Sequence, residues 1–455
     1  MMRYNTIVAA VMTPLIFWGM MICTPAYSQG PHVLPTSPPV AVGSGARAQG
    51  MGGAFIAVAD DATAASWNPG GLGQLQKPEL SIVGRYFFRS EKYNDYVLHQ
   101  EACDMSSLDL NYLSAAYAKT LWRRNVFFSL NYQKLFDFSR ELKLVVPFED
   151  PLDPDDGGLS ETEQHIRFHQ DGSLYTLSPA LAVEIKPGLY LGLAYNVWSD
   201  HITGRSRWKA GIEIVDSYGP YEASLKFNNF QGESLTLGFL WKVSRQFHMG
   251  GVYKAPFQAG LDGEYSIVSK TAGGNLVTDL WKASYEIDFP AAYGLGFSYQ
   301  ISDSWILAGD VTRTEWQDYI ISETSPYQEE VGPFAKYIRD PNGSIVGYYI
   351  PEKKPTYTVR LGVEYTKILD KVIIPFRFGV FYDPEPSVGS PQDFYGVSFG
   401  CGVVINSRIA IDTAYQYRFG REISGNELGF ESAIPTAMKG EIHQHSFLSS
   451  LIYYF

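Results

Sequence analysis

The sequence predicts an all-β protein: a fourteen-stranded antiparallel transmembrane β-barrel with a small N-terminal plug, or hatch. Three observations lead to this fold class. Long stretches alternate polar and apolar residues, long and short connections follow one another in strict alternation, and the last strand ends in an aromatic residue, Phe455. The predicted domains are a signal peptide over residues 1–28, a periplasmic or lumenal hatch over 29–78 and the barrel over 79–455.

The polar–apolar alternation has a period of two residues, which indicates strands with two different faces. In residues 357–366, Tyr357, Val359, Leu361, Val363 and Tyr365 oppose Thr358, Arg360, Gly362, Glu364 and Thr366. Runs of about ten residues match tilted strands that cross a bilayer. The predicted strands are 79–88, 108–118, 125–138, 172–185, 188–200, 222–243, 246–266, 281–301, 304–318, 356–366, 372–382, 393–405, 408–420 and 443–455.

The connections between these strands alternate in length along the whole chain. Short ones at 119–124, 186–187, 244–245, 302–303, 367–371 and 406–407 separate long ones at 89–107, 139–171, 201–221, 268–280, 320–355, 383–392 and 421–442. Outer-membrane barrels have short periplasmic turns and longer outer loops. The alternative, a secreted soluble sandwich or solenoid, has no reason for this alternation. The last strand also resembles the signal that the outer-membrane assembly machinery reads.

The N-terminal residues and the overall charge narrow the location and the partners. Arg3, an apolar run over residues 6–22 and the small residues of Ala26-Tyr27-Ser28 predict a secretory signal cleaved before Gln29. The alternative, a membrane anchor, is disfavoured because the run is short for a bilayer span. The predicted location is therefore the outer membrane of a Gram-negative bacterium. A formal net charge of −12 disfavours nucleic acid as a partner.

The segment before the first strand carries a family resemblance. Residues 45–55 read Gly-Ala-Arg-Ala-Gln-Gly-Met-Gly-Gly-Ala-Phe, and residues 57–70 include Ala-Val-Ala-Asp-Asp-Ala and Asn-Pro-Gly. This pattern resembles the hatch of the FadL/TodX family of outer-membrane hydrocarbon transporters, and the strand count extends the resemblance over the mature chain. The family's lateral window lies where the third strand kinks. Because residues 125–138 contain no Gly or Pro, we expect an unbroken third strand and no such window here.

The hatch residues themselves suggest how the plug is held. Small residues allow a backbone to fold tightly inside a lumen, and an Asn-Pro pair can start a turn into the wall. We expect the two adjacent carboxylates to pair with inward arginines such as Arg360 or Arg418. The candidates for hatch structure and gating are Gly50, Gly53, Asp60, Asp61, Asn68 and Pro69. Each either fixes the plug or contacts a ligand directly, and the sequence leaves both roles open.

Two further groups of residues are candidates for ligand handling. Inward-facing charged residues either brace the lumen through ion pairs or steer a ligand: Asp310, Arg360, Glu364, Asp412 and Arg418. Residues of the connection 320–355 are unusually apolar for a loop, which favours capture of a hydrophobic molecule: Tyr327, Phe334, Tyr337, Tyr348 and Tyr349.

No catalytic or metal-binding constellation accompanies these features. Gly396 to Gly400 spell the pattern of a nucleophile elbow, but they lie inside an alternating strand. We therefore expect no enzyme, no cofactor and no metal. The resemblance implies passive uptake of hydrophobic small molecules, such as long-chain fatty acids or aromatic hydrocarbons. The expected partners are that ligand, outer-membrane lipid and lipopolysaccharide, and the assembly machinery. The alternative function is a non-transporting barrel that serves an assembly or secretion system.

Overall fold

The computed structural model describes residues 40–455, except 95–102, 122–123, 150–160, 217–218, 271–274, 324–335, 340–344, 350–352, 388 and 425–438. The predicted signal peptide lies outside the described residues. None of the helices in the described part of the chain is long and apolar enough to cross a membrane.

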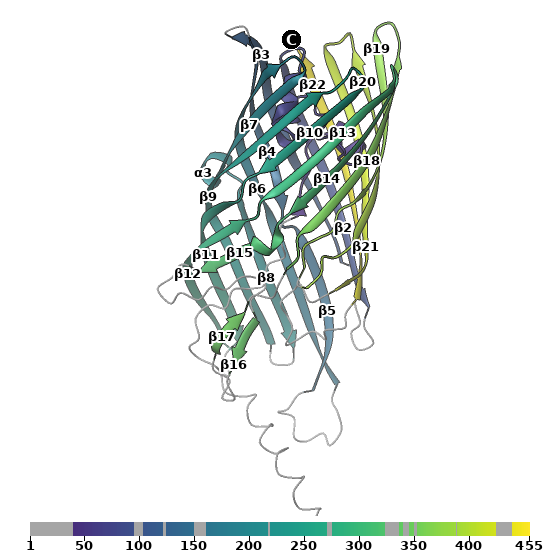
Figure 1. Cartoon of the computed structure of the whole chain (residues 1–455). Coiled ribbons are helices and arrows are strands. Elements are labelled where there is room, and N and C mark those ends of the chain that lie inside the picture. The colour runs from purple at the N-terminus through teal and green to yellow at the C-terminus, as the bar shows by residue number, and fades with distance from the viewer. Residues whose placement is uncertain are drawn as a thin grey trace, which may run out of the picture. The chain divides into compact units, whose positions relative to one another are not determined.

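The described strands form one closed antiparallel barrel, which confirms the predicted fold class (Figure 1). The first and last strands pair along their whole length, from Glu79↔Tyr454 to Asn94↔Lys439, and close the ring. In order, the fourteen transmembrane strands are β2 (Glu79–Asn94), β3 (Cys103–Leu121), β4 (Arg124–Asp137) with β5 (Arg140–Glu149), β6 (Glu161–Lys186), β7 (Leu189–Ser199) with β8 (Arg207–Asp216), β9 (Gly219–Lys242), β10 (Phe247–Lys254) with β11 (Phe257–Lys270), β12 (Leu276–Phe289) with β13 (Ala292–Ser302), β14 (Trp305–Thr314) with β15 (Ile320–Glu323), β18 (Thr356–Ile368), β19 (Val372–Tyr382), β20 (Phe394–Ile405), β21 (Ile409–Ser424) and β22 (Lys439–Tyr454).

Short elements complete the described chain. The N-terminal part contains β1 (Val40–Ala41), α1 (Ala46–Gly50), α2 (Ala64–Trp67) and the 3-10 helix η1 (Pro69–Gln74). The helix α3 (Asp200–Thr203) lies between β7 and β8, and η2 (Trp316–Asp318) lies between β14 and β15. A separate hairpin consists of β16 (Lys336–Arg339) and β17 (Ile345–Tyr349).

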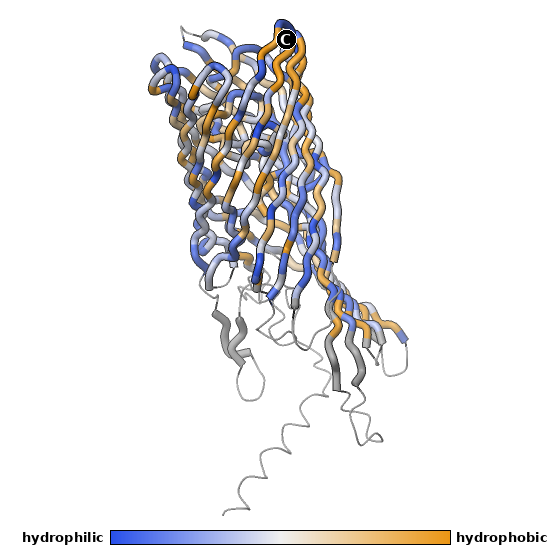
Figure 2. The backbone as a smooth tube through the Cα atoms, turned by 90° about the vertical axis from the view of Figure 1, so that its right-hand side faces the viewer, coloured by the Kyte–Doolittle hydropathy of each residue, from blue (hydrophilic) through white to orange (hydrophobic). Residues whose placement is uncertain are grey.

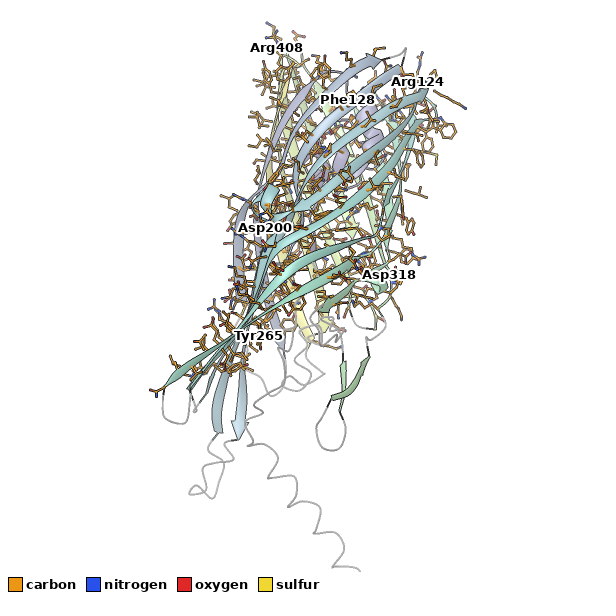
Figure 3. The ribbon with its side chains drawn as sticks, turned by 90° about the vertical axis from the view of Figure 1, so that its left-hand side faces the viewer. Arg124, Phe128, Asp200, Tyr265, Asp318 and Arg408 are labelled. Atoms are coloured by element: carbon orange, nitrogen blue, oxygen red, sulfur yellow. The ribbon has the colours of Figure 1, made fainter. Side chains whose placement is uncertain are left out.

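The outward residues of the barrel are apolar because they face lipid. On β18, Val359 and Leu361 expose 41% and 47% of their surface, whereas the inward Glu364 exposes 4%. Figure 2 shows the resulting alternation of apolar and polar residues along the strands. In Figure 3, Arg124 and Arg408 mark the end of the barrel with the short turns, and Tyr265 lies toward the opposite end. We call these the turn end and the loop end.

Several strands continue beyond the apolar belt at the loop end, so the long connections are shorter than predicted. Strands β5, β6, β8, β9, β11 and β12 form a continuous sheet there. Its outward face is polar: Arg167 forms ion pairs with Glu141 (2.9 Å) and Glu213 (3.4 Å). Along β6 the apolar face changes from outward in the belt to inward beyond it, as at Ile166 and Phe168. A strand whose outward face is polar lies beyond the lipid. Because the apolar face of β6 changes sides, the sequence pattern did not show that the strand continues past the membrane.

The predicted third strand, residues 125–138, corresponds to the continuous strand β4, but a break follows it. Strand β4 ends at Asp137 and β5 begins at Arg140, and pairing between β3 and β4 stops at Tyr112↔Gln133. Beyond that point β1 pairs with β4, at Val40↔Asp137. The break needs neither Gly nor Pro, because the Asp137 carboxylate accepts a hydrogen bond from the Ser139 backbone N–H (2.9 Å). An Asp side chain that bonds backbone two residues on stabilises a turn in place of a strand.

Candidate functional site

The N-terminal segment, residues 40–78, lies within the ring of strands, and we call it the hatch. It contacts walls on different sides of the barrel. The Ala46 N–H donates to Ser450 Oγ on β22 (2.8 Å), and the Phe55 N–H donates to the Asp310 carboxylate on β14 (2.6 Å). The Asn68 amide donates to the Phe239 carbonyl on β9 (2.8 Å). These contacts explain why a segment without strand alternation is ordered: the wall supplies the partners that its backbone lacks.

Glycines allow the hatch to approach the wall closely. Gly52 has a φ of 69° and Gly53 a φ of 79°, a region in which other residues are strained. A Cβ atom at Gly379 of the wall would lie 2.2 Å from the Gly52 nitrogen, and one at Gly50 would lie 3.0 Å from Gly400 Cα. The predicted small residue Gly50 therefore lies at a point of close backbone contact, whereas a Cβ atom at Gly53 would lie 3.0 Å from the Arg360 side chain.

The Asn-Pro pair lies between α2 and η1, where the chain turns toward β2. Asn68 Nδ2 also donates to the Ile56 carbonyl (2.8 Å), and Asn68 Oδ1 accepts from the Gly70 N–H (3.0 Å). Pro69 is the first residue of η1. The backbone N–H that proline lacks would have no partner within the helix at this position, so its absence costs nothing. The side chain of Asn68 thus joins two hatch segments and one wall strand, in addition to starting the turn toward β2.

The hatch carboxylates do not pair with Arg360 or Arg418, contrary to our expectation. Asp60 forms an ion pair with Arg47 of α1. Asp61 accepts hydrogen bonds from the Thr63 N–H (2.8 Å) and hydroxyl (2.6 Å), and burial raises the pKa of its carboxyl. Partners within the hatch lie closer than the wall arginines, and the sequence analysis did not consider Arg47 as one of them.

Arg47 also connects the hatch to the wall. Its Nε and Nη2 atoms each lie 3.0 Å from the Glu364 carboxylate of β18. Glu364 accepts from Arg377 Nε (2.6 Å), and Arg377 Nη1 donates to Asp412 (2.5 Å). Burial by itself would lower the pKa of Arg47, but Asp60 and Glu364 raise it well above its ordinary value. Arg377 was missed in the sequence, although its inward position in an alternating strand was a usable signal.

The remaining predicted charges form a second group nearer the loop end. Arg418 Nη1 donates to Glu385 (2.6 Å), and its Nη2 donates to the Asp383 carbonyl (2.7 Å). Arg360 lies 3.6 Å from the Asp383 carboxylate. Asp310 is occupied by the hatch backbone. We call the inward charged residues of β18, β19 and β21 the charged wall: Arg360, Glu364, Arg377, Asp412 and Arg418.

Across the lumen from several of these charges lies a cluster of aromatic rings. The Phe257 ring is stacked on Phe289 (centroids 4.7 Å apart, planes at 5°) and on Trp198 (5.0 Å, 17°). Phe136 lies 5.9 Å from Trp198. We call Phe136, Trp198, Phe257, Phe289 and Trp316 the aromatic wall. The aromatic wall is formed by predicted strands that carry aromatic side chains on their inward face, where other strands carry polar or small residues. These inward aromatic residues were a usable signal in the sequence.

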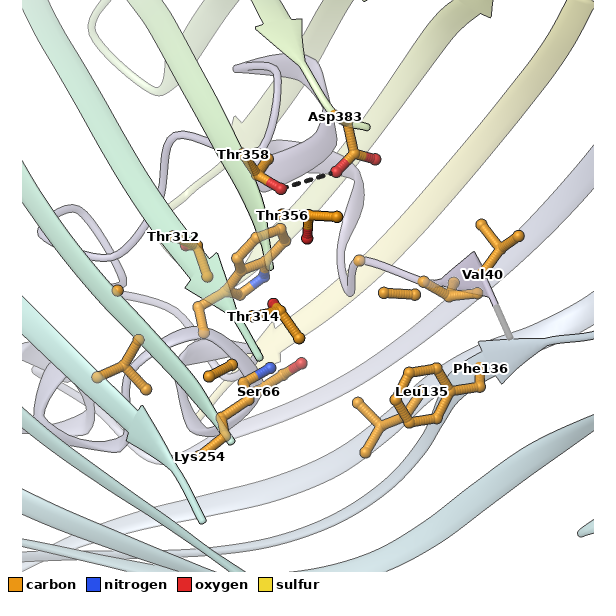
Figure 4. A pocket seen from close by; sticks show the side chains of 18 of the residues that line it. Val40, Ser66, Leu135, Phe136, Lys254, Thr312, Thr314, Thr356, Thr358 and Asp383 are labelled. Carbon is orange, nitrogen blue, oxygen red and sulfur yellow. Dashed lines mark hydrogen bonds between the residues drawn. The ribbon is translucent and has the colours of Figure 1, made fainter. Parts of the chain in front are cut away.

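A cavity of about 270 Å³ lies between the two walls, with hatch residues in its lining, and we call it the chamber. Figure 4 shows Leu135 and Phe136 on one side of the cavity and the threonine side chains on another. The hatch closes it with residues that include Ser66 and Trp67. A second cavity, of about 390 Å³, lies toward the turn end and is lined by polar groups such as Asp60, Glu79 and Arg377. Arg47 lines this second cavity, so the hatch separates an amphipathic chamber from a polar one.

The predicted loop aromatics are only partly covered by the structure. Tyr327 and Phe334 lie outside the described residues. Tyr337 pairs with Tyr348 in the β16–β17 hairpin, which also contains Tyr349, and the description there extends to the backbone only. The nucleophile-elbow pattern lies in β20, where the Ser398 hydroxyl donates to the Gly50 carbonyl (3.0 Å). Within the described ranges, no group of three or more His, Cys, Asp or Glu residues is arranged to hold a metal ion.

Comparisons with known proteins give the same picture. A family model described as outer membrane protein transport protein (OMPP1/FadL/TodX) matches residues 41–455. A crystal structure of a Pseudomonas aeruginosa FadL homologue matches at 16% identity and a TM-score of 0.61, covering 93% of this chain and 100% of that one. The Pseudomonas putida toluene transporter TodX matches at 13% identity and a TM-score of 0.57, covering 93% of this chain and 100% of that one. The Ralstonia pickettii toluene transporter TbuX matches at 13% identity and a TM-score of 0.50, covering 91% of this chain and 98% of that one. Likeness at these identities shows the fold alone. No curated protein sequence matches the chain.

Proposed function

The chain belongs to the OMPP1/FadL/TodX family of outer membrane transport proteins, which confirms the resemblance of its hatch motif. From this premise, we propose that it carries hydrophobic small molecules passively across the outer membrane of a Gram-negative bacterium. Long-chain fatty acids and aromatic hydrocarbons are the two ligand classes to test. The loop end faces the outside in this proposal, and residues 1–28 are removed during export.

The observation that carries the proposal is the chamber between the aromatic wall and the hatch. Apolar ligand surface leaves water when it packs against rings such as Phe136 and Phe257, each only partly buried. Burial of apolar area stabilises the complex by about 25 cal/mol per Å². An open water-filled pore would offer no such gain. The chamber therefore supports capture of a hydrophobic molecule inside the barrel.

The same proposal gives the hatch a gating role. A ligand in the chamber must pass the hatch to reach the polar cavity at the turn end. The Arg47–Glu364 pair connects α1 to the wall at that position. Release follows when the hatch shifts and this contact opens. Asp60, Asp61 and Asn68 hold the hatch in its closed arrangement, whereas the charged wall braces the lumen around it.

Deletion of residues 40–70, with the signal peptide retained, tests the gate. A fourteen-stranded barrel is wider than its own side chains can fill, because filling by side chains holds near eight strands. We expect the deletion variant to give large, persistent ion conductance in planar bilayers, while the intact protein gives little. A folded deletion variant with the low conductance of the intact protein would show that the segment is not the gate.

A second experiment tests transport itself. Proteoliposomes containing the intact protein should take up a radiolabelled fatty acid or toluene faster than protein-free liposomes. Replacing Trp198 by Lys places an amine in the aromatic wall and should reduce that uptake. The matched control is Trp305→Lys at the outward surface near the turn end, a residue that exposes 42% of its area and lies outside the chamber. Equal uptake with and without the protein would contradict the proposal.

The alternative is a non-transporting barrel that serves an assembly or secretion system. The sealed hatch favours it, because a scaffold needs no path through its lumen. Stable co-purification with a secretion complex, together with no binding of any hydrophobic ligand, would support the scaffold. We also propose, as general features of such a barrel, contact with lipopolysaccharide and dependence on the outer-membrane assembly machinery. Depletion of that machinery should leave the chain unfolded in the periplasm.

A further inference from the structure

The chamber contains one charged group that the rest of the protein does not neutralise. Among the described residues that line it, the cations are Lys254, Arg360 and Arg418, and the carboxylates are Asp383 and Glu385. Glu385 lies 2.6 Å from Arg418, and Asp383 lies 3.5 Å from Arg418 and 3.6 Å from Arg360. Two carboxylates thus pair with two guanidinium groups. Lys254 forms no ion pair or hydrogen bond with any described residue, so the chamber carries one excess positive charge.

The register of the sheet surrounds Lys254 with small and hydroxylated residues. Lys254 pairs with Ala292, Ala292 with Thr314, and Thr314 with Thr356. All four line the chamber. Directly paired residues lie about 5 Å apart across each strand. The small Ala292 side chain therefore leaves space between the Lys254 ammonium group and the Thr314 hydroxyl group, and both groups can donate hydrogen bonds to a ligand that enters it.

Aromatic rings lie a short distance along the same strand pair. Phe257 follows Lys254 by three residues and is partly exposed, and its ring stacks with Phe289 and Trp198. Phe289 and Trp198 expose only 2% and 3% of their surface, so the edge of Phe257 is the part of this stack that a ligand can reach. Ring edges are electropositive and attract the face of another aromatic ring. The wall beside the lysine thus suits a flat ring.

The size of the chamber is compatible with a small ligand. Pockets for drug-sized ligands measure about 300–1,000 Å³, and this one measures about 270 Å³ with the hatch as its floor. A single ring with a short substituent fits this space, and the partly exposed Phe257 ring favours a ring over an aliphatic chain.

These observations lead to one ligand class. Resting on the proposed function, we infer that the chamber selects small aromatic carboxylates, with the carboxylate beside Lys254 and Thr314 and the ring against Phe257. Lys254 is the residue that determines this specificity. A carboxylate supplies the negative charge that the ammonium group lacks, and charge-assisted hydrogen bonds are about twice as strong as neutral ones. A neutral hydrocarbon offers no such partner to the ammonium group, which is exposed.

Three probes separate the charge, the ring and the chain length. Benzoate and toluene share a ring and differ in the carboxylate, and dodecanoate has the carboxylate on a long chain. We would titrate the full-length protein in detergent at pH 7 and follow tryptophan fluorescence, because Trp67, Trp198 and Trp316 line the chamber. Benzoate should bind most tightly of the three. If toluene or dodecanoate binds as tightly as benzoate, the inference is overturned while the proposed function stands.

Substitutions then assign the contact. Lys254→Met should weaken benzoate binding by about 10- to 100-fold, the value of a hydrogen bond to a charged group, and leave toluene binding unchanged. Lys254→Arg should retain benzoate binding, and Phe257→Leu should weaken benzoate and toluene alike. The matched control, Lys371→Met in an exposed turn, should bind like the intact protein. Unchanged benzoate affinity in the folded Lys254→Met variant would refute the role of Lys254. Failure of all three probes to bind the intact protein would instead refute hydrophobic uptake, and the inference with it.

Discussion

The charged wall and the aromatic wall face the same lumen, but they are stabilised in opposite ways. On the charged wall, Arg377 lies between Glu364 and Asp412 and exposes 6% of its surface. On the aromatic wall, Phe289 exposes 2% and makes contact through stacked rings. Removing an ion from water costs several kcal/mol unless a partner compensates, whereas burying a ring is favourable in itself.

This difference teaches which wall is free to bind a ligand. The carboxylates and guanidinium groups of the charged wall already satisfy one another, so a ligand would have to displace an existing partner. The partly exposed rings Phe136 and Phe257 can contact a ligand without giving up an ion pair. Ligand binding is therefore expected on the aromatic wall, and the charged wall is expected to hold the barrel and hatch in place. Four predictions test this division, beginning with the largest effect.

Loss of the central guanidinium group should have the largest effect. Arg377→Met leaves the Asp412 carboxylate without its partner and Glu364 with Arg47 alone, and breaking a buried pair costs about 3–5 kcal/mol. We expect the free energy of unfolding in detergent to fall by that amount in a urea titration. The control is Arg313→Met, because Arg313 is exposed beside Glu315 and an exposed pair contributes about 0–1 kcal/mol. Equal effects of the two substitutions would mean that the charged wall does not depend on burial.

The two faces of β18 offer the next test. Leu361→Arg puts a cation into lipid, at a cost of about 2–4 kcal/mol near the bilayer midplane. Arg360→Leu removes the long contact to Asp383 (3.6 Å) and a contact over the Trp67 ring (6.0 Å), and it should cost less. Unfolding of both variants in phospholipid vesicles measures the difference. A larger loss for Arg360→Leu would invert the assignment of faces for this strand.

A smaller effect is expected when one ring of the aromatic wall is lost. Phe257→Leu keeps an apolar side chain but removes two stacked pairs, each contributing about 0.5–1.5 kcal/mol. The expected loss of unfolding free energy is therefore about 1–3 kcal/mol. Phe376→Leu is the control, since Phe376 faces lipid and exposes 49% of its area. If the control loses as much stability as Phe257→Leu, ring stacking does not stabilise the wall.

The smallest effects are local and appear in two different pH ranges. Burial opposes ionisation of Glu385, but Arg418 and Arg89 lower the pKa of its carboxyl below the ordinary value. Its stabilising contribution is present above the ordinary pKa and is lost as pH falls through the lowered value. Burial lowers the pKa of Lys353, which lies over the Tyr319 ring, from 10.5 to about 7. The unfolded state then binds more protons between these values, so stability near Lys353 rises with pH from about 7 to 10.

Amide hydrogen exchange measures both effects. Protection around residues 383–385 should fall on acidification, and protection around residues 316–319 should rise as the solution becomes alkaline. Glu385→Gln and Lys353→Met should each remove one of the two responses and leave the other. If protection in either region stays constant through its own pH range, the ionisation of that residue does not affect local stability, and the prediction for that region is wrong.

The sequence by itself determined the architecture of this protein. Alternation with a period of two, as in residues 357–366, specifies which face meets lipid, because a strand places successive side chains on opposite sides. The same local rule explains why the faces of β18 and the short turns could be predicted. The small residues of the hatch also predicted close backbone approach, which depends on the absence of a Cβ atom and therefore on composition alone.

Only the tertiary structure decided which groups meet. Arg47 and Glu364 are 317 positions apart, and nothing local in either segment predicts their contact. The break after Asp137 depends on a side chain–backbone hydrogen bond that competes with the strand, and the extended sheet depends on where the lipid ends. The excess charge at Lys254 could be recognised only after every other charge around the chamber had found its partner. Alternation tells which way a side chain points, but pairing depends on the distances that the closed barrel creates.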